Sequence, residues 1–304
     1  MLGEFFYWIF NMSIASSLMG FIVLAVRALR AIPRRISVFL WAVPFLRMCI
    51  PLGINNPYSL MTLISRFTTK TVTVYQPTDG VSFSITNFVM AANSYFPITY
   101  KVNLLDGIFS VASFIWLAMA LAIIIALWVL YFTTVREIKS AEHFKDNIYL
   151  SEKVRSPAVY GIFKPRIILP CGYREKEIKY IVRHESTHIR RLDNLWRVLA
   201  FTIVAVHWFN PLAWLFLRLF LADLELACDE AAIAKYDGTE KKEYALSLVD
   251  AAEEKSLFVS AFGGAKIRTR VENILSYKRM TLISLIGFSV LVTAIIIVLI
   301  TNAG

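Results

Sequence analysis

Four long apolar stretches constrain the fold of this 304-residue chain more than any other feature of its sequence. They cover residues 5–26, 36–54, 108–135 and 281–300. A helix of about 20 residues rises about 30 Å, which matches the hydrocarbon core of a bilayer. Hydrophobic residues make up 57% of the chain and charged residues only 18%, so a disordered or fibrous chain is excluded. The sequence therefore predicts a mainly α membrane protein with four transmembrane helices.

Basic residues predict how these helices are oriented. The turn between the first two stretches holds several arginines and no acidic residue. The positive-inside rule places this turn and the Lys/Arg-rich segment 136–280 in the cytoplasm, with the loop 55–107 and both termini outside. The net charge of +10 is spread over loops rather than along one face. We therefore expect contact with the lipid bilayer and no direct contact with nucleic acid.

The predicted topology divides the chain into three parts. Residues 1–135 would hold three N-terminal transmembrane helices and the outer loop 55–107. Residues 136–280 would form a cytoplasmic domain, and residues 281–304 would hold a C-terminal transmembrane helix. The chain would thus be a multi-pass protein of the bacterial cytoplasmic membrane.

The cytoplasmic segment predicts short strands followed by helices. The stretch 147–170 contains the strand-prone runs NIYL and RIIL, and residues 174–194 have the apolar spacing of an amphipathic helix. Residues 195–222 are almost all apolar, but Asn210-Pro211 interrupts them. We expect two helices there that pack on the preceding helix or dip into the inner leaflet; a continuous fifth span is the alternative. Further helices are expected over residues 224–236 and, as an amphipathic and solvated helix, over residues 240–254.

The chemistry of the chain is concentrated in His184-Glu185-Ser186-Thr187-His188, an H-E-x-x-H run. Residues four apart share one face of a helix, so both imidazoles can bind one Zn²⁺. Glu185 lies beside the first histidine and can act as general base toward a water that the metal activates. The run thus predicts a zinc hydrolase site with Glu185 as the catalytic residue.

A catalytic zinc ion needs a third protein ligand. Glu225 and Asp229 are also four residues apart on a predicted helix. We assign Glu225 as the third ligand and Asp229 as the group that accepts the free N–H of a ligand histidine. Alternatively, both carboxylates form a solvated face or salt bridges to Arg190 and Arg191.

For several other polar residues, the sequence is compatible with both a structural and a functional role. Asp193 either orients a zinc ligand or caps a helix end. His207 is expected to be a packing residue, with a role as oxyanion donor as the alternative. Arg47 lies inside the second apolar stretch, where it packs against another helix or serves a function. The stretch 159–169 either belongs to an ordinary small sheet or adds a substrate peptide to its edge.

The three cysteines do not form a paired framework, and none has a neighbour at CxxC spacing. We expect Cys49, Cys171 and Cys228 to be buried apolar side chains. Cys228 adjoins the proposed ligand segment, so metal binding is its alternative role.

With these residues placed, the chain resembles the membrane antirepressor zinc metallopeptidases of β-lactam signalling, the Bla/Mec sensor-transducer family. The matching pieces are RHESTHIRRLDN (183–194), HWFNPLAW (207–214), ELACDEA (225–231), SPAVYGIFKPRIILP (156–170) and LWAVPFLRMCIPL (40–52). The resemblance implies a cytoplasmic gluzincin-like α+β peptidase domain. It also supports His184, His188 and Glu225 as ligands and Glu185 as catalyst.

The resemblance further implies a winged-helix repressor as the cytoplasmic substrate and self-cleavage before the last span. The place expected for self-cleavage is Gly263, Gly264, Lys266 and Arg268. Drug-sensing members of the family carry a penicillin-binding domain after the last span, whereas this sequence ends at Gly304. We therefore expect the input to come from a separate sensor protein, the outer loop or the spans, with a homo-oligomer left open.

Three functions are compatible with these features. The first is a membrane-embedded zinc endopeptidase that cuts a cytoplasmic regulator, or itself, in response to a signal. The second is a signalling scaffold with an inert structural metal site, although such a site has no need of Glu185. The third is a site-2-type intramembrane protease, but Arg183, Arg190 and Asp193 would be costly at mid-bilayer depth.

Overall fold

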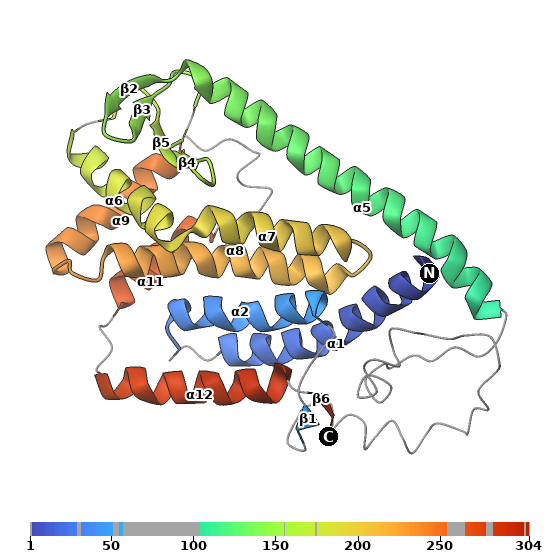
Figure 1. The fold of residues 1–304 in the computed structure, drawn as a ribbon. Coiled ribbons are helices and arrows are strands. Elements are labelled where there is room, and N and C mark those ends of the chain that lie inside the picture. Colours follow the sequence, from blue (N-terminus) through green and yellow to red (C-terminus); the bar gives the residue numbers. More distant parts are fainter. Residues whose placement is uncertain are drawn as a thin grey trace.

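Helices make up most of the structure (Figure 1). The computed structural model describes residues 2–28, 32–50, 55–56, 104–154, 156–173, 175–253, 265–277, 282–300 and 302–303. Most of the expected outer loop, as well as Gly263 and Gly264 of the expected self-cleavage region, lies outside the described residues.

Four helices coincide with the four apolar stretches. They are α1 (Leu2–Ala28), α2 (Arg34–Cys49), α5 (Leu104–Glu137) and α12 (Leu282–Ile300). Among the described helices, α1 and the segment Gly107–Ser140 are long and apolar enough to cross a membrane. At 16 residues, α2 is about 24 Å long, which is shorter than a bilayer core. The structure thus provides two candidate spans, and the crossing by α2 and α12 stays a prediction.

A small sheet follows α5 and the short 3₁₀ helix η2 (Ile138–Ser140). Its strands are β2 (Glu142–Lys145), β3 (Ile148–Leu150), β4 (Ala158–Tyr160) and β5 (Arg166–Leu169), in the order β2-β3-β5-β4. Only the β3–β5 pair of this sheet is parallel. The predicted strands in NIYL and RIIL are β3 and β5. A separate two-residue parallel pairing joins β1 (Asn55–Asn56) to β6 (Asn302–Ala303).

Two antiparallel helices form a hairpin after the H-E-x-x-H helix. This helix is α6 (Glu175–Arg191), and the hairpin consists of α7 (Asp193–Val206) and α8 (Pro211–Ala232), which lie side by side in Figure 1. The Asn210 side chain accepts a hydrogen bond from the Leu212 N–H at 2.9 Å and so caps α8. The alternative of a continuous fifth span is wrong, because the chain reverses between the two helices. The separate helix expected over residues 224–236 is also wrong, because α8 continues unbroken from Pro211.

The hairpin packs lengthwise against α1 and α2. At its tip, the Asn210 amide donates to the hydroxyls of Ser13 and Ser17 of α1, both at 2.8 Å. Near its other end, Asp223 binds Arg27 at 2.7 Å and the Trp41 indole N–H at 2.8 Å. Ser13 precedes Arg27 by 14 positions on α1, which is about 21 Å of helix. The hairpin therefore runs from the arginine turn to about the middle of α1.

Two further helices complete the domain around α6 and α8. They are α9 (Gly238–Glu253) and α11 (Ile267–Ser276). Helix α9 was expected to be solvated, but its Tyr244 is fully buried in a core with Tyr180 and Ile274. Lys266 is the N-cap residue of α11, and Arg268 is exposed in its first turn.

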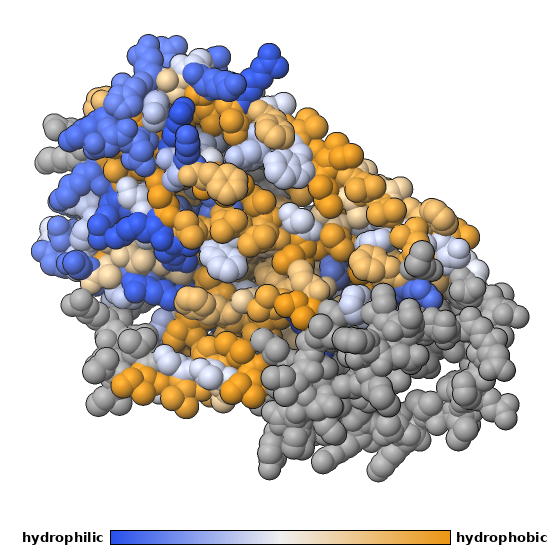
Figure 2. Space-filling model, in the orientation of Figure 1, coloured by the Kyte–Doolittle hydropathy of each residue, from blue (hydrophilic) through white to orange (hydrophobic). Residues whose placement is uncertain are grey.

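Hydrophilic side chains gather over the sheet, α6 and α9, while hydrophobic ones cover α5, the hairpin and α12 (Figure 2). This division matches a membrane region joined to a polar domain. Within α2, Arg47 is 2% exposed, so it packs among helices as expected. The prediction of three buried cysteines is wrong for Cys49 and Cys171, which are exposed, and holds for Cys228.

Asp223 joins α8 to both α1 and α2, so its removal should loosen the hairpin. We expect Asp223→Ala to lower the free energy of unfolding by about 1.5–3 kcal/mol, because hydrogen bonds to a charged group are lost and Arg27 is left unpaired. Chemical unfolding of the detergent-solubilised chain measures this loss. The matched control is Asp250→Ala on the exposed face of α9, which should cost no more than about 0.5 kcal/mol. Equal losses in both variants would contradict the account.

Candidate metal centre

Helix α6 presents the H-E-x-x-H side chains toward the interior of the domain. His184 and His188 are 5% and 4% exposed, and Glu185 is also buried. The helix ends at Arg191, and Leu192 adopts a left-handed conformation with φ of 56°. This turn lets α7 start at once with Asp193, which brings a carboxylate back toward the second histidine.

The two imidazoles and the Glu225 carboxylate converge on one point. The Nε2 atoms of His184 and His188 are 3.1 Å apart. Glu225 of α8 lies 3.7 Å from the His184 Nε2 and 3.6 Å from the His188 Nε2. Zinc bonds of about 2.0–2.1 Å in a tetrahedral arrangement separate ligand atoms by about 3.3 Å. The three side chains therefore have the spacing that one zinc ion requires.

Each histidine also has a carboxylate on the other side of its ring. The Nδ1 of His188 is 2.6 Å from Asp193, and the Nδ1 of His184 is 3.2 Å from Asp229. The Tyr244 hydroxyl lies 2.8 Å from the same His184 Nδ1 and donates to Asp229 at 2.8 Å. A carboxylate at Nδ1 fixes the proton there and leaves Nε2 free to bind a metal. Asp229 was expected to accept the free N–H of a ligand histidine, and it lies beside the Nδ1 of His184. Asp193 lies beside the Nδ1 of His188, a position from which it can orient that ring.

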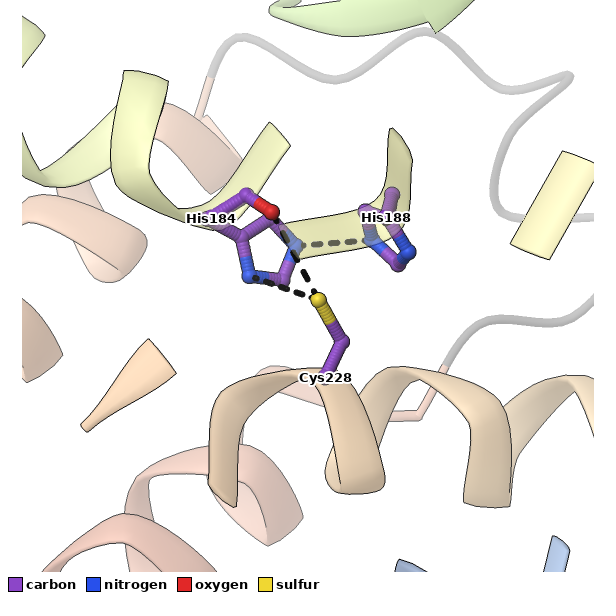
Figure 3. Close-up of side chains that lie close together, drawn as sticks. All are labelled: His184, His188 and Cys228. Carbon is purple, nitrogen blue, oxygen red and sulfur yellow. Dashed lines mark hydrogen bonds between the residues drawn. The ribbon is translucent and has the colours of Figure 1, made fainter. Parts of the chain in front are cut away.

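Cys228 is a second potential partner for the metal. The ligand atoms of His184, His188 and Cys228 all lie within 4.8 Å of one another, and Figure 3 shows the thiol of α8 below the two rings. The Cys228 sulfur contacts the His184 Nδ1 at 3.7 Å and the His184 carbonyl oxygen at 3.5 Å. The thiol also hydrogen-bonds His188, so it lies close to both histidines.

Arginines surround the Glu225 carboxylate. Arg197 of α7 donates to it, and Arg270 of α11 lies 3.5 Å away. The alternative that Glu225 and Asp229 form salt bridges to Arg190 and Arg191 is wrong. Arg190 donates to the Thr187 hydroxyl, and Arg191 pairs with Asp193.

These contacts shift the ionisation of the site. Burial raises the pKa of Asp229, but the Arg270 guanidinium outweighs burial and holds that pKa below its usual range. Burial also raises the pKa of Glu225, but His188 and Arg270 bring it well below the usual range. Burial lowers the pKa of His188, but the charges of Cys228 and Glu225 raise it to about 9. In the absence of metal, these contacts favour the doubly protonated, cationic form of His188.

The sequence interpretation missed Tyr244 and Arg270. Neither belongs to a motif, and both come from helices whose approach to α6 depends on tertiary packing. The alternative of His207 as oxyanion donor is wrong, because His207 follows the far end of α7, about 21 Å of helix from Asp193.

The edge of the sheet lies next to the start of α7. The Ile167 N–H of β5 donates to Asn147 on the β3 side, so its partner Val159 in β4 turns its own carbonyl toward the open edge. There the Asn194 amide donates to the carbonyls of Val159 at 3.0 Å and Gly161 at 3.3 Å. Asn194, which follows Asp193 directly, thus joins this edge to the metal centre.

A buried H-E-x-x-H helix with a facing carboxylate, next to membrane-length helices, defines a membrane metallopeptidase type of site. The chain belongs to the BlaR1 peptidase M56 family, whose model matches residues 7–276. The family expected from the sequence motifs is thereby confirmed.

Three curated relatives show how far the similarity extends. The regulatory protein BlaR1 of Bacillus licheniformis is 32% identical over 111 residues, which are 36% of this chain and 18% of that protein. The methicillin resistance mecR1 protein of Staphylococcus aureus is 26% identical over 144 residues, 44% of this chain and 25% of that protein. The regulatory protein BlaR1 of Staphylococcus aureus is 27% identical over 144 residues, 43% of this chain and 25% of that protein. The chain thus spans at most a quarter of the length of these relatives.

The raised pKa of His188 gives a test of metal binding. Below about pH 9, a zinc ion must displace a proton from His188 in order to bind. The affinity for zinc should therefore weaken as the pH falls, by about tenfold per pH unit for each proton displaced. Calorimetry of zinc binding in buffers of different ionisation enthalpy counts the protons released. Zinc uptake between pH 7 and 8 with no proton release would contradict this description of the site.

Proposed function

We propose that this chain is a membrane-embedded zinc endopeptidase that cleaves a cytoplasmic repressor-like protein, and also itself, in a transmembrane signalling pathway. The observation that carries the proposal is the Glu225 carboxylate, which faces the Nε2 atoms of both His184 and His188. Membership of the BlaR1 peptidase M56 family supports a metal-dependent peptidase.

In this proposal the zinc ligands are His184, His188 and Glu225. The alternative ligand Cys228 contacts the Nδ1 of His184, where Tyr244 and a carboxylate already bind the ring, and it also hydrogen-bonds His188. A metal ion bound through the His184 Nδ1 would have to displace Tyr244 and the carboxylate, whereas Glu225 faces the Nε2 atoms of both histidines. A bound zinc ion would lower the pKa of a water molecule and polarise the carbonyl of the peptide bond.

The chain's own catalytic group is Glu185. It follows His184 directly on α6 and is buried. Glu185 accepts a proton from the attacking water and donates it to the leaving amine. An inert scaffold would not need such a base beside its ligands.

The open edge of β4 supports a peptide substrate. Its outward Val159 carbonyl accepts a hydrogen bond from Asn194, which follows the residue that orients His188, so a peptide would pair with the other backbone groups of this edge. An extended peptide that adds to this edge would pass the metal centre. The relatives named as a regulatory protein and a methicillin resistance protein favour a role in regulation, and we propose a repressor-like regulator as that substrate.

Self-cleavage before the last helix is consistent with the position of α11. Arg270 of this helix reaches the metal centre, so Lys266 and Arg268 at its start lie within about one turn of a residue that touches the site. A cut beside Lys266 or Arg268 would therefore lie close in sequence to a residue of the site.

The topology is part of the proposal. Four helices would cross the bilayer within residues 1–135 and 281–304, with a gluzincin-like α+β domain over residues 136–280 in the cytoplasm and both termini outside. The polar end in Figure 2 and the hairpin that begins level with the arginine turn support this arrangement.

Two substitutions separate catalysis from metal binding. Glu185→Gln should keep zinc and abolish cleavage, because the amide cannot accept a proton, whereas Glu225→Ala should weaken zinc binding itself. Zinc content by mass spectrometry and cleavage of a co-expressed regulator measure the two effects. Cleavage by purified Glu185→Gln protein would refute the mechanism, and tight zinc binding by Glu225→Ala would refute the ligand set.

The exposed native cysteines test the orientation. We expect an impermeant thiol reagent to label a variant that retains only Cys171 in inside-out vesicles but not in intact cells, because the sheet lies in the cytoplasm. A variant that retains only Cys49, at the outer end of α2, should show the opposite pattern. Labelling of Cys171 in intact cells would contradict the proposed topology.

A further inference from the structure

Arg270 contacts three side chains of the metal centre, His184, Glu225 and Asp229, from outside the H-E-x-x-H helix. It lies on α11, is 3% exposed, and comes 41 positions after Asp229 and 86 positions after His184. No motif singled it out. We propose that Arg270 is a positioning residue that makes zinc binding depend on the docking of α11; this inference rests on the proposed zinc site.

The guanidinium holds Asp229 in a two-bond fork. Its Nε donates to one carboxylate oxygen at 2.8 Å and a terminal nitrogen donates to the other at 2.8 Å. Such a planar fork fixes both the position and the rotation of a carboxylate. Asp229 is fully buried, so its charge also needs a nearby cation.

Asp229 in turn determines the orientation of His184. The oxygen 3.2 Å from the His184 Nδ1 is the same Oδ1 that accepts from Arg270 and from Tyr244. The Tyr244 hydroxyl lies 2.8 Å from the same Nδ1 and donates to that Oδ1, so a rotated carboxylate would disturb both partners of the ring nitrogen and loosen the aim of Nε2. Arg270 thus acts on the ligand through Asp229.

Arg270 also faces the atoms that would bind the metal. A terminal nitrogen lies 3.2 Å from the His184 Nε2 and another lies 3.5 Å from Glu225. The nitrogen near Nε2 is the same one that donates to the Asp229 Oδ1, so a zinc ion at Nε2 would require it to turn away from that ring atom, while the bond from the Arg270 Nε to the other Asp229 oxygen can persist. The positioning role therefore survives metal binding.

The position of α11 gives this fork a consequence for regulation. Residues 267–276 come shortly before α12, the C-terminal apolar helix. Any displacement of α11 withdraws the guanidinium from Asp229 and leaves a buried carboxylate without its main cation. The C-terminal segment thereby controls how well the site holds zinc.

The test measures the zinc dissociation constant of the full-length chain in detergent, by competition with a chromophoric chelator. All variants carry Glu185→Gln so that the chain stays whole. Arg270→Met should weaken zinc binding by about 10–100-fold, the usual effect of losing a group that orients a ligand histidine. Arg270→Lys keeps the charge but not the fork, so it should recover only part of the affinity. Arg268→Met, two residues away and exposed, is the matched control and should bind zinc like the parent.

The outcomes separate the inference from the proposed function. The inference is overturned if Arg270→Met binds zinc as tightly as the parent or more tightly, or if Arg270→Lys restores full affinity, since charge alone would then suffice. If Arg270→Met does not fold, a lower affinity of Arg270→Lys at an unchanged melting temperature of the metal-free chain supports the inference, and an unchanged affinity overturns it. If His188→Ala also binds zinc like the parent, the zinc site itself is wrong.

Discussion

Two buried imidazole nitrogens 3.1 Å apart, with a carboxylate facing both, form the arrangement on which the rest of the structure depends. Nitrogen lone pairs directed at one another and at a buried anion are stable only when a cation, either a proton or a metal ion, lies between them. The helices around α6 supply the groups that maintain this geometry. Asp193 and Asp229 orient the rings, and Arg270 compensates the buried negative charge.

Helix α8 joins this site to the membrane region. Asp223, which binds the arginine turn, and Glu225, which faces the histidines, are two residues apart on it. The contact between Asp223 and Arg27 therefore places the metal centre close to the end of α1. A movement of α1 or α2 that disturbs Asp223 would be transmitted through less than one turn of helix to Glu225.

The sequence predicted the parts that depend on local patterns. The apolar stretches, the strands in NIYL and RIIL, and the helix of His184 and His188 follow from hydrophobicity and spacing. The unbroken α8 was missed because the polar run around Glu225 looks like a new element, although no residue there ends a helix. Tyr244 and Arg270 could not be predicted, since their contacts with Asp229 depend on how α9 and α11 pack. The exposure of Cys49 and Cys171 likewise depends on position in the fold rather than on residue type.

The central claim is that His184, His188 and Glu225 hold a zinc ion and that Cys228 does not. X-ray absorption of the zinc-loaded, full-length chain tests this directly, because Zn–N and Zn–O bonds are about 2.0–2.2 Å long and a Zn–S bond is about 2.3 Å. We predict a first shell of nitrogen and oxygen alone, with the outer-shell signal of two imidazoles. A sulfur neighbour at about 2.3 Å would contradict the account and identify Cys228 as the third ligand.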